Sequence, residues 1–131
     1  MTDDQEMRNA ALESLERSDK YPFTYLMLCN IAHLKKDYVS EEKWLERALD
    51  IEPYYFLARI LLAELFIEEG KLKDAESQLD LLKRQKREVS KTVKEQAWHL
   101  TGFQLTLVEL PDSEIGLVEE KLAQAKSEKK Q

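Results

Sequence analysis

Apolar residues recur along the chain at intervals of three or four positions, which is the spacing of one face of an α-helix. The pattern predicts seven helices joined by short loops. The first is expected over residues 3–19, where Met7, Ala11 and Leu15 share a face. Pro22 suits the first turn of a second helix, because a proline there loses no hydrogen bond.

Turn residues mark the limits of the next helices. The second helix should fade near Lys36, and Ser40 is the predicted N-cap of a third. A fourth helix is predicted from Tyr54 to Glu69, with Gly70 closing it in the left-handed conformation.

The fifth helix begins near Leu72 and is expected to end in the basic run 83–87. Cations there would complement the negative end of the helix dipole. The simplest interpretation of the run is therefore a solvated helix end before a long linker. The alternative is a nuclear-import signal or a patch that binds polyanions.

The last two helices lie on either side of Pro111. The sixth covers about 91–109, and Asp112 or Ser113 caps the seventh. The apolar stripe of the seventh helix comprises Ile115, Val118, Leu122 and Ala125. Residues 126–131 are expected to form a frayed polar tail.

The composition favours one helical, globular domain. Apolar residues make up 43% of the chain and charged residues 35%. That is too apolar for a disordered chain and too charged for a membrane-embedded one. Three glycines and three prolines supply little material for the turns of an all-β fold. We therefore expect a single all-α domain over residues 1–131.

The sequence repeats itself with a period of 34 residues. At this offset Leu28 aligns with Leu62, and the small residues Cys29 and Ala63 align with each other. Further matched pairs are Leu26 with Ile60, Ile31 with Leu65 and Leu45 with Leu79. A fixed period with two helices per unit is typical of a solenoid, in which each unit buries its apolar face only by stacking on its neighbours.

In these positions the chain resembles the tetratricopeptide repeat. That family places a large residue, a leucine and a small residue on the first helix of a unit. The second helix carries an alanine, a bulky residue and another alanine, and a proline opens the next unit. The first window holds Tyr25, Leu28, Cys29, Tyr38, Leu45, Ala48 and Pro53. The second holds Leu62, Ala63, Phe66, Gly70, Ala75 and Leu79, and the third keeps Trp98, Gly102 and Leu105.

Three residues depart from the family pattern. Glu41 stands where a small alanine is usual, Arg59 where a large aromatic is usual, and Arg87 where the closing proline belongs. The second helix of the third window also matches poorly.

The resemblance implies an all-α helix-turn-helix solenoid of about three units with an extra N-terminal helix. The leading helix would cover 3–19, the first unit 22–53 and the second 56–89. A divergent third unit or cap would cover 91–127. A generic solenoid of helical hairpins is the structural alternative.

The resemblance also implies a concave groove, lined by the first helix of each unit. The expected groove residues are Phe23, Leu26, Asn30, His33, Ile60, Glu64, Ile67, His99 and Phe103. Asn30 matches a family asparagine that hydrogen-bonds the ligand backbone, although it could instead simply meet solvent. Leu26, Ile60 and Ile67 could alternatively pack beneath an extra helix of the same chain.

The implied function is a protein–protein interaction module, as an adaptor, scaffold or chaperone-like protein. Apolar positions with acidic points at Glu64 and Glu68 suit an amphipathic or apolar partner segment with a basic flank. Chaperone-binding members grip a C-terminal carboxylate with cations, but those positions hold Leu26, His99 and Phe103 here. The alternative is a structural role in a larger solenoid or a homo-oligomer.

Charge and cysteine content exclude other classes of protein. The net charge of −6, with its acidic excess in residues 1–82, disfavours nucleic acid as a ligand. No apolar run reaches the roughly 18 residues that span a bilayer, so membrane insertion is not expected. The single cysteine, Cys29, favours a reducing compartment, and we expect a cytoplasmic location.

Little in the sequence favours catalysis. His33 and His99 lie in no metal-binding spacing, and Gly70 and Gly102 are isolated. Cys29 occupies the small packing position and is predicted to be a buried thiol. We therefore expect no enzyme activity, no catalytic residue, no metal and no cofactor. An enzyme or nucleotide-binding protein on a helical scaffold is the least favoured alternative.

Overall fold

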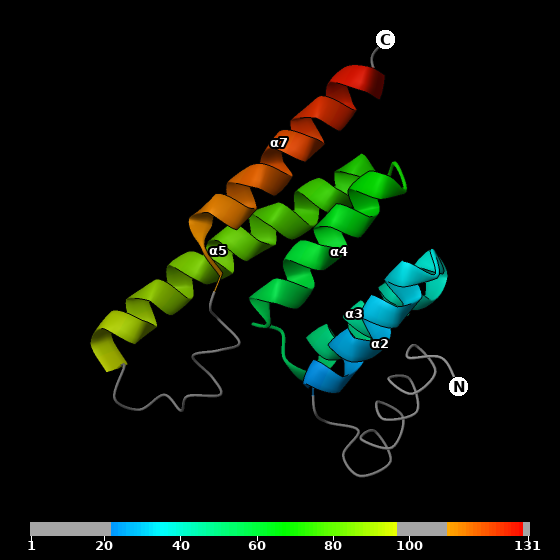
Figure 1. Ribbon diagram of the computed structural model, residues 1–131. Helices are drawn as coiled ribbons and strands as arrows, with labels where there is room; N and C mark the ends of the chain where they lie inside the picture. The colour runs from blue at the N-terminus through cyan, green and yellow to red at the C-terminus, as the bar shows by residue number, and fades with distance from the viewer. Residues whose placement is uncertain (1–21, 97–109, 130–131) are drawn as a thin grey trace. The chain divides into compact units, whose positions relative to one another are not determined.

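Five α-helices form the part of the chain that the computed structural model describes, residues 22–96 and 110–129 (Figure 1). They are α2 (Pro22–Leu34), α3 (Tyr38–Ile51), α4 (Phe56–Glu68), α5 (Leu72–Gln96) and α7 (Asp112–Lys129). No strand occurs in these two ranges, which confirms the all-α prediction for them. The predicted leading helix over 3–19 and residues 97–109 of the predicted sixth helix lie outside the described residues.

The described helices belong to two compact units that divide between Pro53 and Tyr54. In the first unit α2 packs against α3. In the second, α4 packs against α5, and α7 packs against both. Each unit thus contains one helix pair joined by a short turn. The predicted extents of three repeats, and of a single domain over 1–131, stay predictions.

The core of the first unit uses the apolar positions that repeat along the sequence. Leu28 and Cys29 of α2 and Leu45 of α3 are each at most 4% exposed. The ring of Tyr25 stacks on that of Trp44, with centroids 5.9 Å apart. A small side chain at Cys29 allows the two helices to approach closely, and the larger ones fill the remaining space.

The second unit buries the corresponding positions. Leu62 and Ala63 of α4 and Leu79 of α5 are as inaccessible as their counterparts 34 residues earlier. Ala75 and Leu82 of α5 have no exposed surface. The period seen in the sequence therefore corresponds to two copies of the same helix pair.

Both pairs turn in the same way. After α2, the amides of Lys36 and Asp37 donate to carbonyls of the last helical turn at 3.0 and 2.9 Å. After α4, the amides of Gly70 and Lys71 do the same at 3.0 and 2.8 Å. The first of the two donor residues in each turn has a left-handed backbone conformation, with φ of 57° at Lys36 and 77° at Gly70. The prediction for Gly70 is confirmed.

The prediction that Ser40 caps the third helix is wrong. The N-cap of α3 is Asp37, whose Oδ1 accepts the Ser40 amide at 3.2 Å. Aspartate is among the best N-caps, and its carboxylate is also favoured by the positive end of the helix dipole. The helix therefore starts at Tyr38 and takes Ser40 into its first turn.

The predicted end of the fifth helix is also wrong. α5 continues to Gln96, so the basic run 83–87 lies inside the helix and is not its C-terminal end. Arg87 occupies the position of the helix-ending proline, and no glycine or proline occurs between Gly70 and Gly102. Without such a residue nothing in the run interrupts the helical hydrogen bonds.

α7 begins at Asp112, so the two residues predicted to cap it, Asp112 and Ser113, lie inside its first turn, whereas its apolar stripe is the predicted one. The buried members of the stripe are Ile115, Val118 and Leu122. The frayed tail expected over 126–131 is wrong as far as Lys129, where the helix ends. One reason is that Lys126 is held by an ion pair with Glu76 of α5.

Candidate functional site

Four of the expected groove residues lie on α2. Phe23 and Leu26 are half-buried, whereas Asn30 and His33 are exposed. Met27 is 40% exposed. These five residues follow one another at intervals of one to three positions on the same side of the helix, and we call them the α2 face.

His33 is tied to a buried carboxylate. Its Nδ1 lies 2.9 Å from Oε1 of Glu41, the residue that replaces the usual small alanine on α3. Burial, with a smaller contribution from the Glu41 charge, raises the pKa of the Cys29 thiol to about 12. Cys29 is thus a buried, neutral thiol, as expected, and is poorly suited to act as a nucleophile.

The other described groove candidates lie on α4, in the second unit. Ile60 is 3% exposed, and Glu64 and Ile67 are half-buried. Oε2 of Glu64 lies 3.7 Å from Nζ of Lys121 on α7. The burial of Ile60 fits the alternative that apolar residues here pack beneath another helix of the chain. His99 and Phe103 fall outside the described residues.

α7 lies along the α4–α5 pair and runs antiparallel to α5 (Figure 1). Its ion pairs to α5 are Asp112 with Lys86, Glu119 with Lys83, and Lys126 with Glu76. Such surface pairs contribute little individually, so the buried stripe holds most of the helix in place. Two cations of the basic run are thereby paired within the second unit.

Arg59 replaces the usual aromatic residue and is buried in the second unit. Its Nε donates to Oε1 of Gln85 at 3.2 Å, and its Nη1 donates to Oε1 of Gln78 at 2.7 Å. Burial lowers the pKa of the guanidinium from its usual value. The two amides of α5 satisfy donors that an apolar core would leave unbonded.

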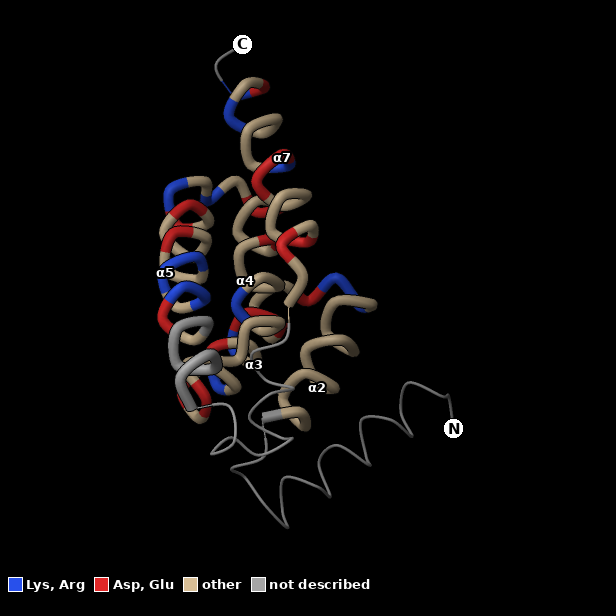
Figure 2. Tube along the Cα trace, turned by 90° about the vertical axis from the view of Figure 1, so that its left-hand side faces the viewer, with Lys and Arg blue, Asp and Glu red and all other residues tan. Residues whose placement is uncertain are grey.

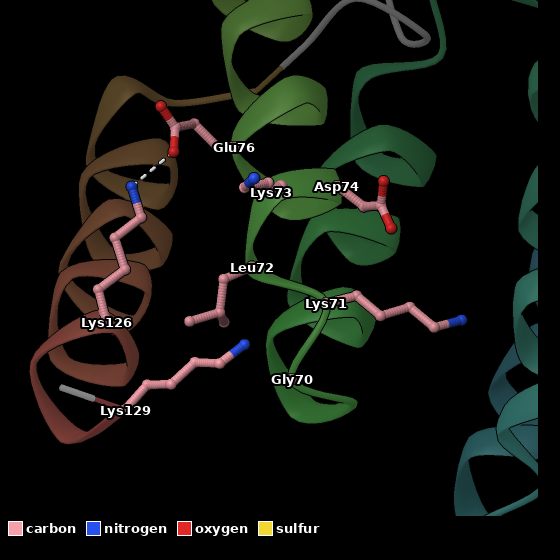
Figure 3. A pocket seen from close by; sticks show the side chains of 8 residues that line it. All are labelled: Gly70, Lys71, Leu72, Lys73, Asp74, Glu76, Lys126 and Lys129. Carbon is pink, nitrogen blue, oxygen red and sulfur yellow. Dashed lines mark hydrogen bonds and ion pairs between the residues drawn. The ribbon is translucent and has the colours of Figure 1, made fainter. Parts of the chain in front are cut away.

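A hollow lies between the start of α5 and the end of α7 (Figure 3). Leu72 and Lys129 line it, and the ammonium of Lys126 is bonded to Glu76 at its edge. Within the described ranges, no three His, Cys, Asp or Glu side chains gather as a metal site requires.

Residues 42–94 match the family model of the tetratricopeptide repeat. This segment, which is less than half of the chain, is similar to a tetratricopeptide repeat. The matched segment begins in α3 and ends in α5, so it includes all of α4 and α5 up to residue 94. Tetratricopeptide repeats generally mediate protein–protein interactions and are typically not catalytic. Comparison with curated proteins and with solved structures gives no match.

Some apolar side chains are exposed that the repeat pattern does not indicate. The exposure of Met27 was not predicted, because α2 is apolar almost all round and its spacing does not say which side faces outward. One signal was present. Residues 22–34 contain no Asp, Glu, Lys or Arg, and His33 is the one basic residue among them.

No helix in the described part of the chain is both long and apolar enough to cross a membrane.

Proposed function

We propose that the α2 face binds a segment of a partner protein, and that the chain acts as an adaptor or scaffold. The observation that carries the proposal is the absence of Lys, Arg, Asp and Glu from α2, which Figure 2 shows as a helix without charged colour. A helix on a protein surface normally turns a charged or polar face to water. α2 instead presents Leu26 and Met27 there.

An exposed apolar face of this kind is typical of a contact surface. The α2 face is one helix wide, and its members are separated by three or four positions along most of its length. That geometry suits an amphipathic helix or an extended segment with apolar anchors. Asn30 lies within the face and offers both a donor and an acceptor, which could fix the register of the bound segment.

The second unit supplies a parallel within the same chain. At the positions equivalent to Leu26 and Asn30, α4 carries Ile60, which is buried, and Glu64, which pairs with Lys121 of α7. A helix with an apolar stripe can thus pack against this kind of helix pair. Because Glu64 already faces a cation, it gives little support to the expected preference for a basic flank on the partner.

A photo-crosslinking amino acid at position 27 tests the proposal directly. In native lysate it should form adducts with a small set of proteins, whereas the same group at the exposed Arg47 of α3 should not. Leu26→Asp and Asn30→Ala should weaken partner capture while circular dichroism stays unchanged. Equal adduct patterns from the two positions would show that the α2 face has no special role. Ile60→Asp is unsuitable for this test, because Ile60 is in the core.

The same apolar face favours one second candidate, self-association. A second copy of the chain could cover α2 instead of a different protein. Multi-angle light scattering at rising concentration separates these roles, since a dimer that is lost in Leu26→Asp would support self-association. A single cysteine, Cys29, that is buried as a free thiol fits a reducing compartment such as the cytoplasm for either role.

A further inference from the structure

The turn between α2 and α3 exposes apolar side chains that the α2 face does not include. Leu34, the last residue of α2, is 61% exposed, and Val39, the second residue of α3, is 83% exposed. Tyr38 beside it is 38% exposed. Lys35 and Lys36 lie between them. We call these five residues the turn surface.

The equivalent turn of the second unit shows that the fold does not need apolar residues here. The positions of Leu34 and Val39 are taken by Glu68 and Lys73, which are exposed and charged. Both turns have three residues and the same pattern of amide bonds. Since charged residues satisfy this backbone in one copy, the exposed Leu34 and Val39 of the other copy serve something besides folding.

Lys36 gives a second, independent indication. It adopts a φ of 57°, in the left-handed region where its equivalent is Gly70. A side chain in that region costs about 1 kcal/mol relative to glycine. A residue held against such a cost at a surface turn points to a function of its side chain.

The charge of the turn surface indicates the partner. Lys35 and Lys36 are exposed, and neither forms an ion pair with any residue of the described ranges. Asp37, which follows Lys36 in the sequence, is engaged as the N-cap of α3. Two cations next to three apolar side chains complement a segment in which apolar anchors stand beside Asp or Glu.

We infer that the turn surface is a second contact site, which binds an acidic, apolar segment of a partner protein. An anionic membrane fits less well. Two lysines contribute only about 1 kcal/mol each at such a surface, and the net charge of −6 opposes approach to it. The site does not depend on the α2 face, because the two surfaces share no residue.

The second unit supplies the matched variant for a test. Leu34→Glu combined with Val39→Lys copies the residues of the equivalent turn, so the fold should tolerate both changes. Random peptides displayed on phage are selected on the full chain and, separately, on this double variant. Peptides enriched on the full chain alone should carry Asp or Glu next to Leu, Ile or Phe. The affinity of the most enriched peptide should fall about tenfold or more in the double variant.

Two controls separate function from folding. Lys36→Gly should weaken binding of the peptide and at the same time raise the melting temperature of the protein. A purely structural role of Lys36 would not produce this combination. Leu117→Glu, at an apolar residue 56% exposed on α7, should leave peptide binding unchanged.

Several results would overturn the inference. They are equal enrichment on the full chain and the double variant, enrichment of basic peptides, or an affinity that Lys36→Gly leaves intact. Binding of the chain to vesicles of phosphatidylcholine and phosphatidylserine is the last measurement. If these vesicles bind the full chain but do not bind the double variant, the turn surface is a membrane contact. The assignment to a protein segment is then wrong.

Discussion

Glu41 and Arg59 occupy core positions that hold Ala75 and Tyr25 in the other helix pair. Each brings charge into a place where an apolar side chain would pack without a partner. Glu41 bonds to His33, and Arg59 donates to two amides of α5. A buried polar group is tolerated when it forms its hydrogen bonds. Removing one partner leaves the other buried without a hydrogen bond, at the full cost of its desolvation.

Arg59→Ala should lower the free energy of unfolding by about 3 kcal/mol, because it deprives Gln78 and Gln85 of their donor and leaves a cavity. Urea unfolding followed by circular dichroism measures the loss. Arg47→Ala, at an exposed position of α3, should change stability by less than about 0.5 kcal/mol. Similar losses in both variants would contradict the role assigned to the buried guanidinium.

The Cys29 thiol should react with iodoacetamide far more slowly in the folded chain than in urea at pH 8, because its pKa is raised to about 12 and little thiolate is present. A raised pKa favours the neutral thiol in the folded state. Its contribution to stability is therefore complete below the unfolded pKa near 9 and declines as the pH rises toward 12. Unfolding curves of Cys29→Ala should lose that part of the alkaline decline.

At the scale of the helix, capping residues decide where elements begin. Asp37→Ala should destabilise the first unit by about 1 kcal/mol, because the side-chain acceptor at the start of α3 is lost. Thermal unfolding of the variant measures this change. Ser40→Ala is the matched control and should cost little, since Ser40 contributes its backbone amide to the cap. A larger effect at position 40 would restore the sequence-based choice of cap.

Helix ends were predicted correctly from the sequence where they carry a residue with one strongly preferred role, such as proline or glycine. Pro22 opens α2 and Gly70 follows the end of α4 in the left-handed conformation, as expected. The prediction failed at Ser40, where a better cap stood three residues earlier. It failed again after residue 87, where cations resembled a helix end although no residue stopped the helix.

The candidate site was predictable only in part. The spacing placed Phe23, Leu26, Asn30 and His33 on one helix, and the structure shows them at its surface or half-buried. Sequence spacing could not show that Ile60 is buried or that Glu64 meets Lys121. The Glu64–Lys121 pair depends on where α7 packs, which is decided by tertiary contacts between segments about 57 residues apart.

For the molecule as a whole, the division into two units predicts independent responses to damage. Val118→Asp places a charge in a side-chain position that is 1% exposed on α7. Hydrogen exchange read by mass spectrometry should then show lost protection in α7 and in the faces of α4 and α5 beneath it. Peptides from α2 and α3 should keep their protection. Loss of protection throughout the chain would show that the units unfold as one.

The order of charges along α5 and α7 limits how these helices can meet. α5 carries Glu76 early and its lysines later, while α7 carries its acids early and Lys126 late. All three pairs bring opposite charges together when the two helices run antiparallel. A reversed approach would set lysine against lysine while still burying the same stripe. We therefore expect that raising the ionic strength leaves the attachment of α7 largely intact but weakens its preference for one orientation.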